Sequence, residues 1–250
     1  MIPKVIHYCW FGGQPLPDSV TRCLASWRRV CPDYQVKRWD ESNWDVTQMP
    51  YVRQAYAQKK FAFVADVARL DVIARHGGIY LDTDVELLEP LDAFLTYDAF
   101  FGMEEPGRVN TGVGFGAISK HAMVEDLLAQ YQQRKFMCRN RPDLTTCVTI
   151  AAPLFKEWGV QRNQQIQYLQ DKRVVILPPT YFCPEDLASG KLRLTAQSVA
   201  IHHYAVTWKP ATSLTVTRWK IRSRRIIDAV GGEGSYARLK SWYNTVRSKI

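Results

Sequence analysis

The sequence predicts a single α/β domain, and three observations carry that prediction. The chain opens with a β-rich stretch at 4–11, a short amphipathic helix at 20–30 and a second strand at 34–39, an order typical of a parallel sheet. Residues 61–75 repeat apolar side chains at helical spacing and end at Gly77-Gly78, before a very short apolar strand at 79–81. Of the 250 residues, 46% are apolar, which is enough for a sizeable core and excludes a disordered chain.

The remaining elements follow the same pattern. Strands are expected at 99–103, 112–118 and 174–177, a helix at 121–134, and a strand or bend at 85–88. No stretch is long and apolar enough for a transmembrane helix, and the first residues lack the pattern of a signal peptide. The six cysteines show no zinc-type spacing, so we expect reduced thiols in a cytosolic compartment rather than a disulfide framework.

The positive charge is concentrated near the end of the sequence. The formal net charge is +9, but residues 209–250 hold ten basic and two acidic residues, leaving the first 208 residues almost neutral. We therefore expect a catalytic or binding domain over 1–208 and a separate basic segment over 209–250.

The stretch from Asp66 to Asp84 is the best candidate for chemistry. Asp66 and Arg69 share one face of the predicted helix, and the short strand after it leads to Asp82 and Asp84. Ligands of open α/β sheets bind at the carboxyl ends of strands, and two carboxylates there can share Mg²⁺ or Mn²⁺. Either pair alone has an ordinary explanation, a solvated turn or a helix ion pair. Their combination with the Gly-Gly turn is much rarer.

These residues resemble a known family of enzymes. The segment with Asp66-x-x-Arg69 and Gly77-Gly78-Ile-Tyr80-Leu-Asp82-Thr-Asp84 is similar to the sugar-binding DXD region of glycosyltransferase family 32, which includes bacterial capsular and lipopolysaccharide enzymes, the initiating mannosyltransferase and, more distantly, glucosylating toxin domains. The opening IPKVIHYCWFGG and the later AIHHYAVTW are similar to further elements of that family, with Thr207 in place of a serine.

The resemblance implies a GT-A fold and a retaining, metal-dependent transfer of a hexose or N-acetylhexosamine from a nucleotide-sugar donor. It implies a saccharide acceptor that is lipid-linked, as in surface polysaccharide synthesis. Asp84 is then the direct metal ligand, Asp82 a contact to ribose and metal, Asp66 a contact to sugar or ribose hydroxyls, and Arg69 a contact to the diphosphate or transferred sugar. The other donor-binding candidates are His7, Tyr8, Trp10, Gly78, Tyr80, Asn110 and Trp208.

Two of these elements leave alternatives open. Asn110 starts the stretch Asn-Thr-Gly-Val, which we expect to open a strand; its amide either contacts the donor sugar or only shapes a turn. His202 and His203 are adjacent on a predicted strand, so only one of them faces the site. We favour His203 as the third metal ligand because of its spacing to Trp208.

The basic segment predicts where the protein works. Residues 214–230 and 236–250 form two basic amphipathic helices rich in Trp and Tyr, which suit an anionic membrane surface or pack on the domain. We expect a cytoplasmic protein, peripheral on the cytoplasmic face of a membrane, and no nucleic-acid partner.

Two other function classes compete with a glycosyltransferase. A haloacid-dehalogenase-like phosphatase also uses D-x-D after a strand, but Glu86 stands where its motif has Thr or Val. A non-catalytic membrane or nucleic-acid binding module is opposed by the intact acidic residues. The sequence leaves open the donor nucleotide, although UDP-sugars are favoured over GDP-mannose. It also leaves open the acceptor, the linkage and the oligomeric state.

Overall fold

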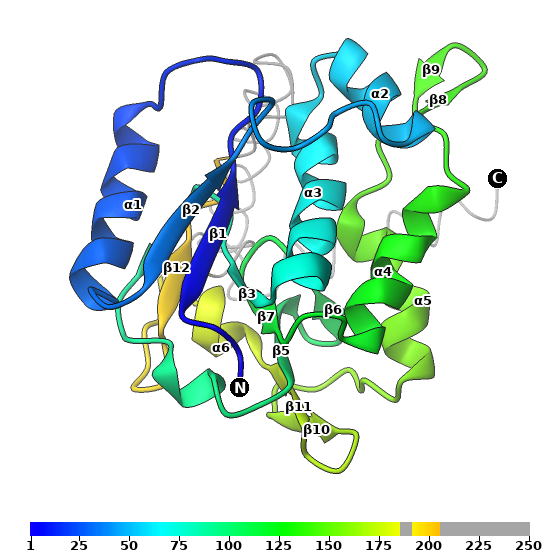
Figure 1. Cartoon of the computed structure of the whole chain (residues 1–250). Helices are drawn as coiled ribbons and strands as arrows, with labels where there is room; N and C mark the ends of the chain where they lie inside the picture. The colour runs from blue at the N-terminus through cyan, green and yellow to red at the C-terminus, as the bar shows by residue number, and fades with distance from the viewer. Residues whose placement is uncertain (186–191, 206–250) are drawn as a thin grey trace, which may run out of the picture. The chain divides into compact units, whose positions relative to one another are not determined.

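The core of the molecule is a mixed β-sheet. A computed structural model describes residues 1–185 and 192–205, of which Met1–Pro184 and Leu194–Ala205 form one compact unit. Its sheet has the order β10-β11-β5-β7-β3-β1-β2, with β6 paired to β5 (Figure 1). The strands are β1 (Val5–Cys9), β2 (Gln35–Trp39), β3 (Gly78–Tyr80), β5 (Ala99–Glu105), β6 (Arg108–Val109), β7 (Phe115–Ala117), β10 (Gln167–Leu169) and β11 (Val174–Leu177).

The strand directions decide where side chains gather. β1 runs parallel to both β2 and β3, and β11 runs parallel to β5, whereas β7 is antiparallel to β3 and β5. The carboxyl ends of β1, β2 and β3 therefore meet at one edge of the sheet. The residues after β3 lie at that edge, close to the turn that enters β7.

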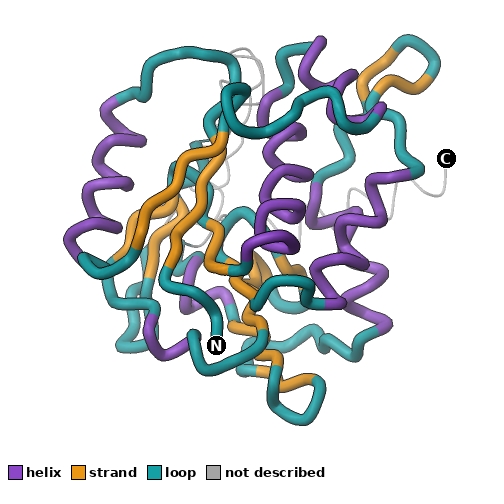
Figure 2. The backbone as a smooth tube through the Cα atoms, viewed as in Figure 1, coloured by secondary structure: helices purple, strands orange, loops and turns teal. Residues whose placement is uncertain are grey.

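Helices lie on both sides of this sheet, as the backbone tube shows (Figure 2). Among the described residues they are α1 (Asp18–Val30), α2 (Pro50–Ala57), α3 (Phe61–His76), η1 (Asp92–Phe94), α4 (Ala122–Gln132), α5 (Cys147–Glu157) and α6 (Pro179–Phe182). α3 packs on β1, β3 and β7 and is covered in turn by α2 and α4, so most of its side chains are buried. None of the helices in these described segments could cross a bilayer, since none is both long and apolar enough.

A second, two-stranded sheet holds the segment after β3. β4 (Val85–Leu87) pairs antiparallel with β12 (Ala200–His202). α1 fixes β4 in place: the Trp27 indole nitrogen donates to the Val85 carbonyl at 2.7 Å, and the Leu87 amide donates to the Ser26 hydroxyl at 2.9 Å. Two strands of two residues each, β8 (Met137–Cys138) and β9 (Arg141–Pro142), form a hairpin that pairs with neither sheet.

The α/β class with a mixed sheet flanked by helices is confirmed. The helix predicted at 61–75 is α3, and the strand predicted at 174–177 is β11. The strand expected at 112–118 is shorter, because residues 111–113 form a turn and β7 begins only at Phe115. α2 and α5 were not predicted; α5 contains Pro153, which breaks the sequence signal of a helix. The predicted basic helices over 214–230 and 236–250, and the domain boundary after 208, lie outside the described residues.

Candidate functional site

A tight turn between α3 and β3 brings the acidic residues to the sheet edge. Gly77 and Gly78 have φ angles of +65° and +105°, which side chains other than glycine rarely adopt. A Cβ on Gly78 would lie 2.8 Å from the His7 Nε2 and from the Val5 carbonyl oxygen. Only glycine allows β3 to approach β1 this closely, and β3 then runs straight to Asp82.

Arg69 links the helix to the strand end. Its Nη2 lies 2.8 Å from Asp66 Oδ1 and 3.4 Å from Asp82 Oδ1, and its Nε donates to the Ala65 carbonyl at 3.2 Å. The Tyr80 hydroxyl donates to the same Asp82 oxygen at 2.9 Å. Arg69 is 3% exposed, so this guanidinium is a buried, fixed positive charge between two carboxylates.

The surroundings of the two carboxylates that pair with Arg69 disfavour their charged forms. Burial raises the pKa of Asp66 to about 6, against the opposing pull of Arg69. Burial likewise raises the pKa of Asp82, and the charge on Asp84 adds to that shift while Arg69 opposes it. Carboxylates held this close together repel each other unless a further cation joins them.

Asp82, Asp84 and His202 converge on one point. Each of the three offers a ligand atom, and these atoms all lie within 4.8 Å of one another. The His202 Nε2 is 3.2 Å from Asp84 Oδ1, while the Ala205 amide donates to Asp84 Oδ2 at 2.8 Å. Burial alone would raise the pKa of Asp84, but His202 and the Ala205 amide outweigh it and hold that pKa at about 2. Asp84 is therefore ionised at neutral pH.

The structure places His202, rather than the favoured His203, beside Asp84. We predicted His203 as third ligand, but its Nε2 lies 2.9 Å from Glu86 Oε2 and its side chain is 46% exposed. His202 pairs with Val85 in the β12–β4 register, and this puts its ring on the side of Asp84. The register between two strands decides between adjacent histidines, and the sequence does not contain that register.

The three side chains fit a divalent cation. Two carboxylates and one imidazole are donors that Mn²⁺ accepts readily, and Mg²⁺ binds carboxylates in the same way. Asp84 and His202 are held in place by hydrogen bonds. The Asp82 side chain is 29% exposed, so the cluster is open to solvent on the side of Asp82. A cation here would also relieve the repulsion between Asp82 and Asp84.

The turn before β7 closes the site from the other side. The Asn110 Oδ1 accepts from the Gly112 amide at 2.7 Å, and its Nδ2 donates to Glu104 Oε2 at 2.9 Å. The Gly112 carbonyl in turn accepts from the Asp82 amide at 2.9 Å. The Asn110 amide thus shapes the turn that supports Asp82. Gly112 belongs to the Asn-Thr-Gly-Val stretch that the sequence singled out, whereas Glu104 was not predicted.

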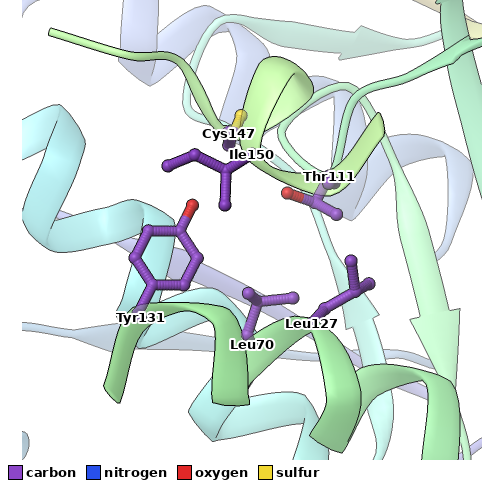
Figure 3. A pocket seen from close by; sticks show the side chains of 7 residues that line it. Leu70, Thr111, Leu127, Tyr131, Cys147 and Ile150 are labelled. Atoms are coloured by element: carbon purple, nitrogen blue, oxygen red, sulfur yellow. The ribbon is translucent and has the colours of Figure 1, made fainter. Parts of the chain in front are cut away.

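Cys147 is a second residue that sequence reasoning missed. Its sulfur lies 3.9 Å from Arg69 Nη1 and 3.8 Å from Asn110 Oδ1, at the start of α5. Figure 3 shows Cys147 at the edge of a small pocket, with Thr111 and Tyr131 on other sides. No motif marks Cys147 in the sequence, because α5 reaches the site only through tertiary packing.

The donor-binding candidates on β1 and directly after it make contacts within the protein. The His7 Nε2 meets the Gly77 carbonyl at 3.0 Å, and the Trp39 indole nitrogen donates to the His7 Nδ1 at 3.0 Å. The Tyr8 ring packs edge-on against the core residue Trp27. The half-buried Trp10 donates its indole N–H to the Gln14 carbonyl at 2.6 Å. Trp208 lies outside the described residues.

One family description matches part of this chain. Residues 17–101 match the family described as "Glycosyltransferase sugar-binding region containing DXD motif". Asp66, Arg69, Asp82 and Asp84 all lie inside the matched segment.

The curated relatives match over shorter parts of their length. The chain is 32% identical over 116 residues to "Inositol phosphoceramide mannosyltransferase 3" of Schizosaccharomyces pombe, covering 45% of this chain and 32% of that protein. It is 24% identical over 185 residues to "Mannosyl phosphorylinositol ceramide synthase SUR1" of Saccharomyces cerevisiae, covering 68% and 47%. The chain thus spans less than half the length of these fungal relatives, which are not of the bacterial capsular type that we expected.

A solved structure titled "PaToxG Glycosyltransferase" is 18% identical, with a TM-score of 0.47 over 62% of this chain and 67% of that one.

Proposed function

We propose that this protein is a divalent-metal-dependent glycosyltransferase of the GT-A type that uses a nucleotide-sugar donor. One observation carries the proposal: the convergence of Asp82, Asp84 and His202 beside the buried Asp66–Arg69 pair, inside the segment that matches the DXD family. A fixed guanidinium and a carboxylate cluster at a sheet edge suit a ligand with a diphosphate and several hydroxyl groups.

The reaction exchanges one bond at the anomeric carbon. The bond to the diphosphate oxygen breaks, a bond to an acceptor hydroxyl oxygen forms, the hydroxyl proton is released, and a nucleoside diphosphate leaves. A bound Mn²⁺ or Mg²⁺, held by Asp82, Asp84 and His202, would neutralise the charge that develops on the leaving group.

The protein's own residues supply positioning. Arg69 is held by Asp66, Asp82 and the Ala65 carbonyl, and its Nη1 lies beside Thr111 and Cys147, so the side chain supplies a fixed positive charge beside Asp82 and the donor's diphosphate. Asp66, at the buried end of the same cluster, accepts from sugar or ribose hydroxyls. Because the leaving group is a stabilised diphosphate, no separate general acid is needed, and we propose that the anomeric configuration is retained.

The transferred sugar is a hexose or an N-acetylhexosamine. The sequence favours a UDP-sugar, whereas the printed names of the fungal relatives indicate mannose, so GDP-mannose belongs in the first set of donors tested. A lipid-linked saccharide acceptor, a role in surface polysaccharide synthesis and a peripheral location on the cytoplasmic face of a membrane are further parts of the proposal.

Release of nucleoside diphosphate from a panel of nucleotide sugars tests the proposal. We expect turnover of one donor that requires Mn²⁺ or Mg²⁺, is abolished by chelation, and falls at least about 100-fold in Asp84→Asn. Asp126→Asn, an exposed carboxylate on α4, serves as the matched control and should retain full activity. Full activity of Asp84→Asn with the correct donor would overturn the assignment.

A further inference from the structure

A face of the molecule carries positive charge with no acidic residue in the segments that form it. Residues 46–65, which include α2, and residues 127–142, which include the β8–β9 hairpin, hold seven basic side chains and no Asp or Glu. We call this the basic face; its charged residues are Arg53, Lys59, Lys60, Arg134, Lys135, Arg139 and Arg141. Since the first 208 residues together are nearly neutral, seven basic residues and no acidic one in these two segments are a marked concentration.

The two segments are adjacent in space. The Met137 amide donates to Gln54 Oε1 at 2.9 Å, and the Tyr51 and Phe136 rings pack edge-on with centroids 5.6 Å apart. Figure 1 shows α2 beside β8 and β9. Phe136 is fully buried and anchors the hairpin, so the charged hairpin is a fixed projection of the fold.

Nearby carboxylates neutralise little of this charge. The Asp143 Oδ2 lies 3.8 Å from the Arg134 Nη1, and the Asp143 Oδ1 accepts from the Thr145 hydroxyl. Glu41 accepts from the Tyr56 hydroxyl at 3.0 Å and from the Gly12 amide. Arg53, Lys59, Lys135, Arg139 and Arg141 are exposed.

An apolar side chain accompanies the charges. Leu144 follows the hairpin and is 44% exposed, one of the few large apolar residues at the described surface. Exposed basic residues with an adjacent apolar side chain are typical of proteins that contact an anionic bilayer, because the charges attract the headgroups and the apolar group enters the interface.

The basic face lies next to the candidate site. Four residues separate Pro142 at the end of β9 from Cys147, a span of five Cα–Cα steps, and the Cys147 sulfur is 3.9 Å from the Arg69 Nη1. Such a segment spans at most about 17 Å. A membrane bound at the hairpin would therefore lie close enough to the site for a membrane-embedded acceptor to place its reacting end there.

We infer that the basic face is a docking surface for an anionic phospholipid bilayer. It lies in the folded domain and is distinct from the basic segment at 209–250. Only the role of this surface rests on the proposed function: it would hold the site over a membrane-embedded acceptor. Bilayer binding itself requires neither donor nor metal.

Vesicle co-sedimentation of the full chain tests this inference with two matched triple variants. Arg53→Gln/Lys135→Gln/Arg141→Gln removes three charges from the basic face, and Arg22→Gln/Arg28→Gln/Arg29→Gln removes three exposed charges from α1, on the opposite side in Figure 1. At about the free energy expected per basic residue near an anionic surface, the first triple should bind phosphatidylserine-containing vesicles about 100-fold more weakly. The α1 triple should bind like the unmodified chain, and neither should bind pure phosphatidylcholine.

Cys138 allows the contact to be located. It is the exposed one of the six cysteines, and it lies in the hairpin itself. An environment-sensitive fluorophore on Cys138 should shift to the blue with anionic vesicles. The same probe on α1, in Cys138→Ser/Ala25→Cys, should not shift.

Equal weakening by both triples, no weakening by either, or a blue shift only at position 25 would overturn the inference. So would loss of RNA binding in the basic-face triple together with unchanged vesicle binding, since that result indicates a nucleic-acid surface. Failure of the proposed function is separable: Asp84→Asn should lose donor turnover and keep vesicle binding, whereas the basic-face triple should keep turnover with soluble acceptors.

Discussion

Substitution of Gly112 by alanine should disable the site through a single added methyl group. A Cβ at this position would lie 2.1 Å from Asp82 Oδ2 and 2.8 Å from Arg69 Nη1. An ordinary contact needs about 3.5 Å, so the Asp82 carboxylate must retreat by roughly 1 Å or more. Its freedom to do so is limited, because its other oxygen is held by Tyr80 and Arg69.

The magnitude follows from that displacement. A misplacement of about 1 Å in a catalytic constellation costs about 100-fold in rate, and overpacking a buried position costs about 1–3 kcal/mol of folding stability. We therefore expect Gly112→Ala to lower metal-dependent release of nucleoside diphosphate about 100-fold. Its free energy of unfolding in urea should fall by about 1–3 kcal/mol.

Two controls isolate the contact with Asp82. Gly159→Ala adds a methyl group where no atom lies within 4 Å, although its φ of +91° strains the backbone; it should lose stability and keep activity. In an Asp82→Ala background the clash is largely removed, so Gly112→Ala should cost about 0.5–3 kcal/mol less stability than it does alone. Gly112→Ala that retains activity within threefold, or an equal stability loss in both backgrounds, would refute the reasoning.

Two further predictions concern buried charges and pH. Arg69→Lys keeps the charge but cannot bridge both acidic partners, so donor turnover should fall by about 10- to 100-fold at every pH; a rate close to that of the unmodified chain would contradict the positioning role. Burial lowers the pKa of His7 to about 4, with the charges of His76 and Lys37 adding to the shift and the hydrogen bond to the Gly77 carbonyl opposing it. The unfolded chain binds a proton at its ordinary pKa near 6.5 and the folded chain does not, so stability is complete above that pH and is lost as pH falls from about 6.5 to 4. Urea unfolding should show a loss of about 3 kcal/mol over this window that His7→Gln lacks, and parallel pH profiles of the two proteins would refute the assignment.

Local patterns were sufficient to predict most of the fold. The apolar repeat of α3, its glycine end and the short strand after it are encoded within 20 consecutive residues, and the structure places them as predicted. α5 was missed because Pro153 interrupts it, and α2 because eight residues give too short a pattern. Packing against α3 and α4 stabilises these helices, and no local pattern contains that information.

The site was predictable where its residues are close in sequence. Asp66, Arg69, Asp82 and Asp84 come from one helix–turn–strand unit, and the structure brings them together through the contacts of Arg69. Residues contributed by other elements were harder: Glu104 and Cys147 reach the site by chain folding alone, and no motif marks them. The choice between adjacent histidines depends on how β12 pairs with β4.

Binding of Mn²⁺ to the full chain, followed by electron paramagnetic resonance with His202→Gln and His203→Gln side by side, tests the central claim most directly. The structure places His202 against Asp84 and His203 against Glu86. We predict that His202→Gln weakens Mn²⁺ binding by at least about 10-fold while His203→Gln leaves it unchanged. Weaker binding in His203→Gln alone, or unchanged binding in both, would contradict the assignment of Asp82, Asp84 and His202 as the metal site.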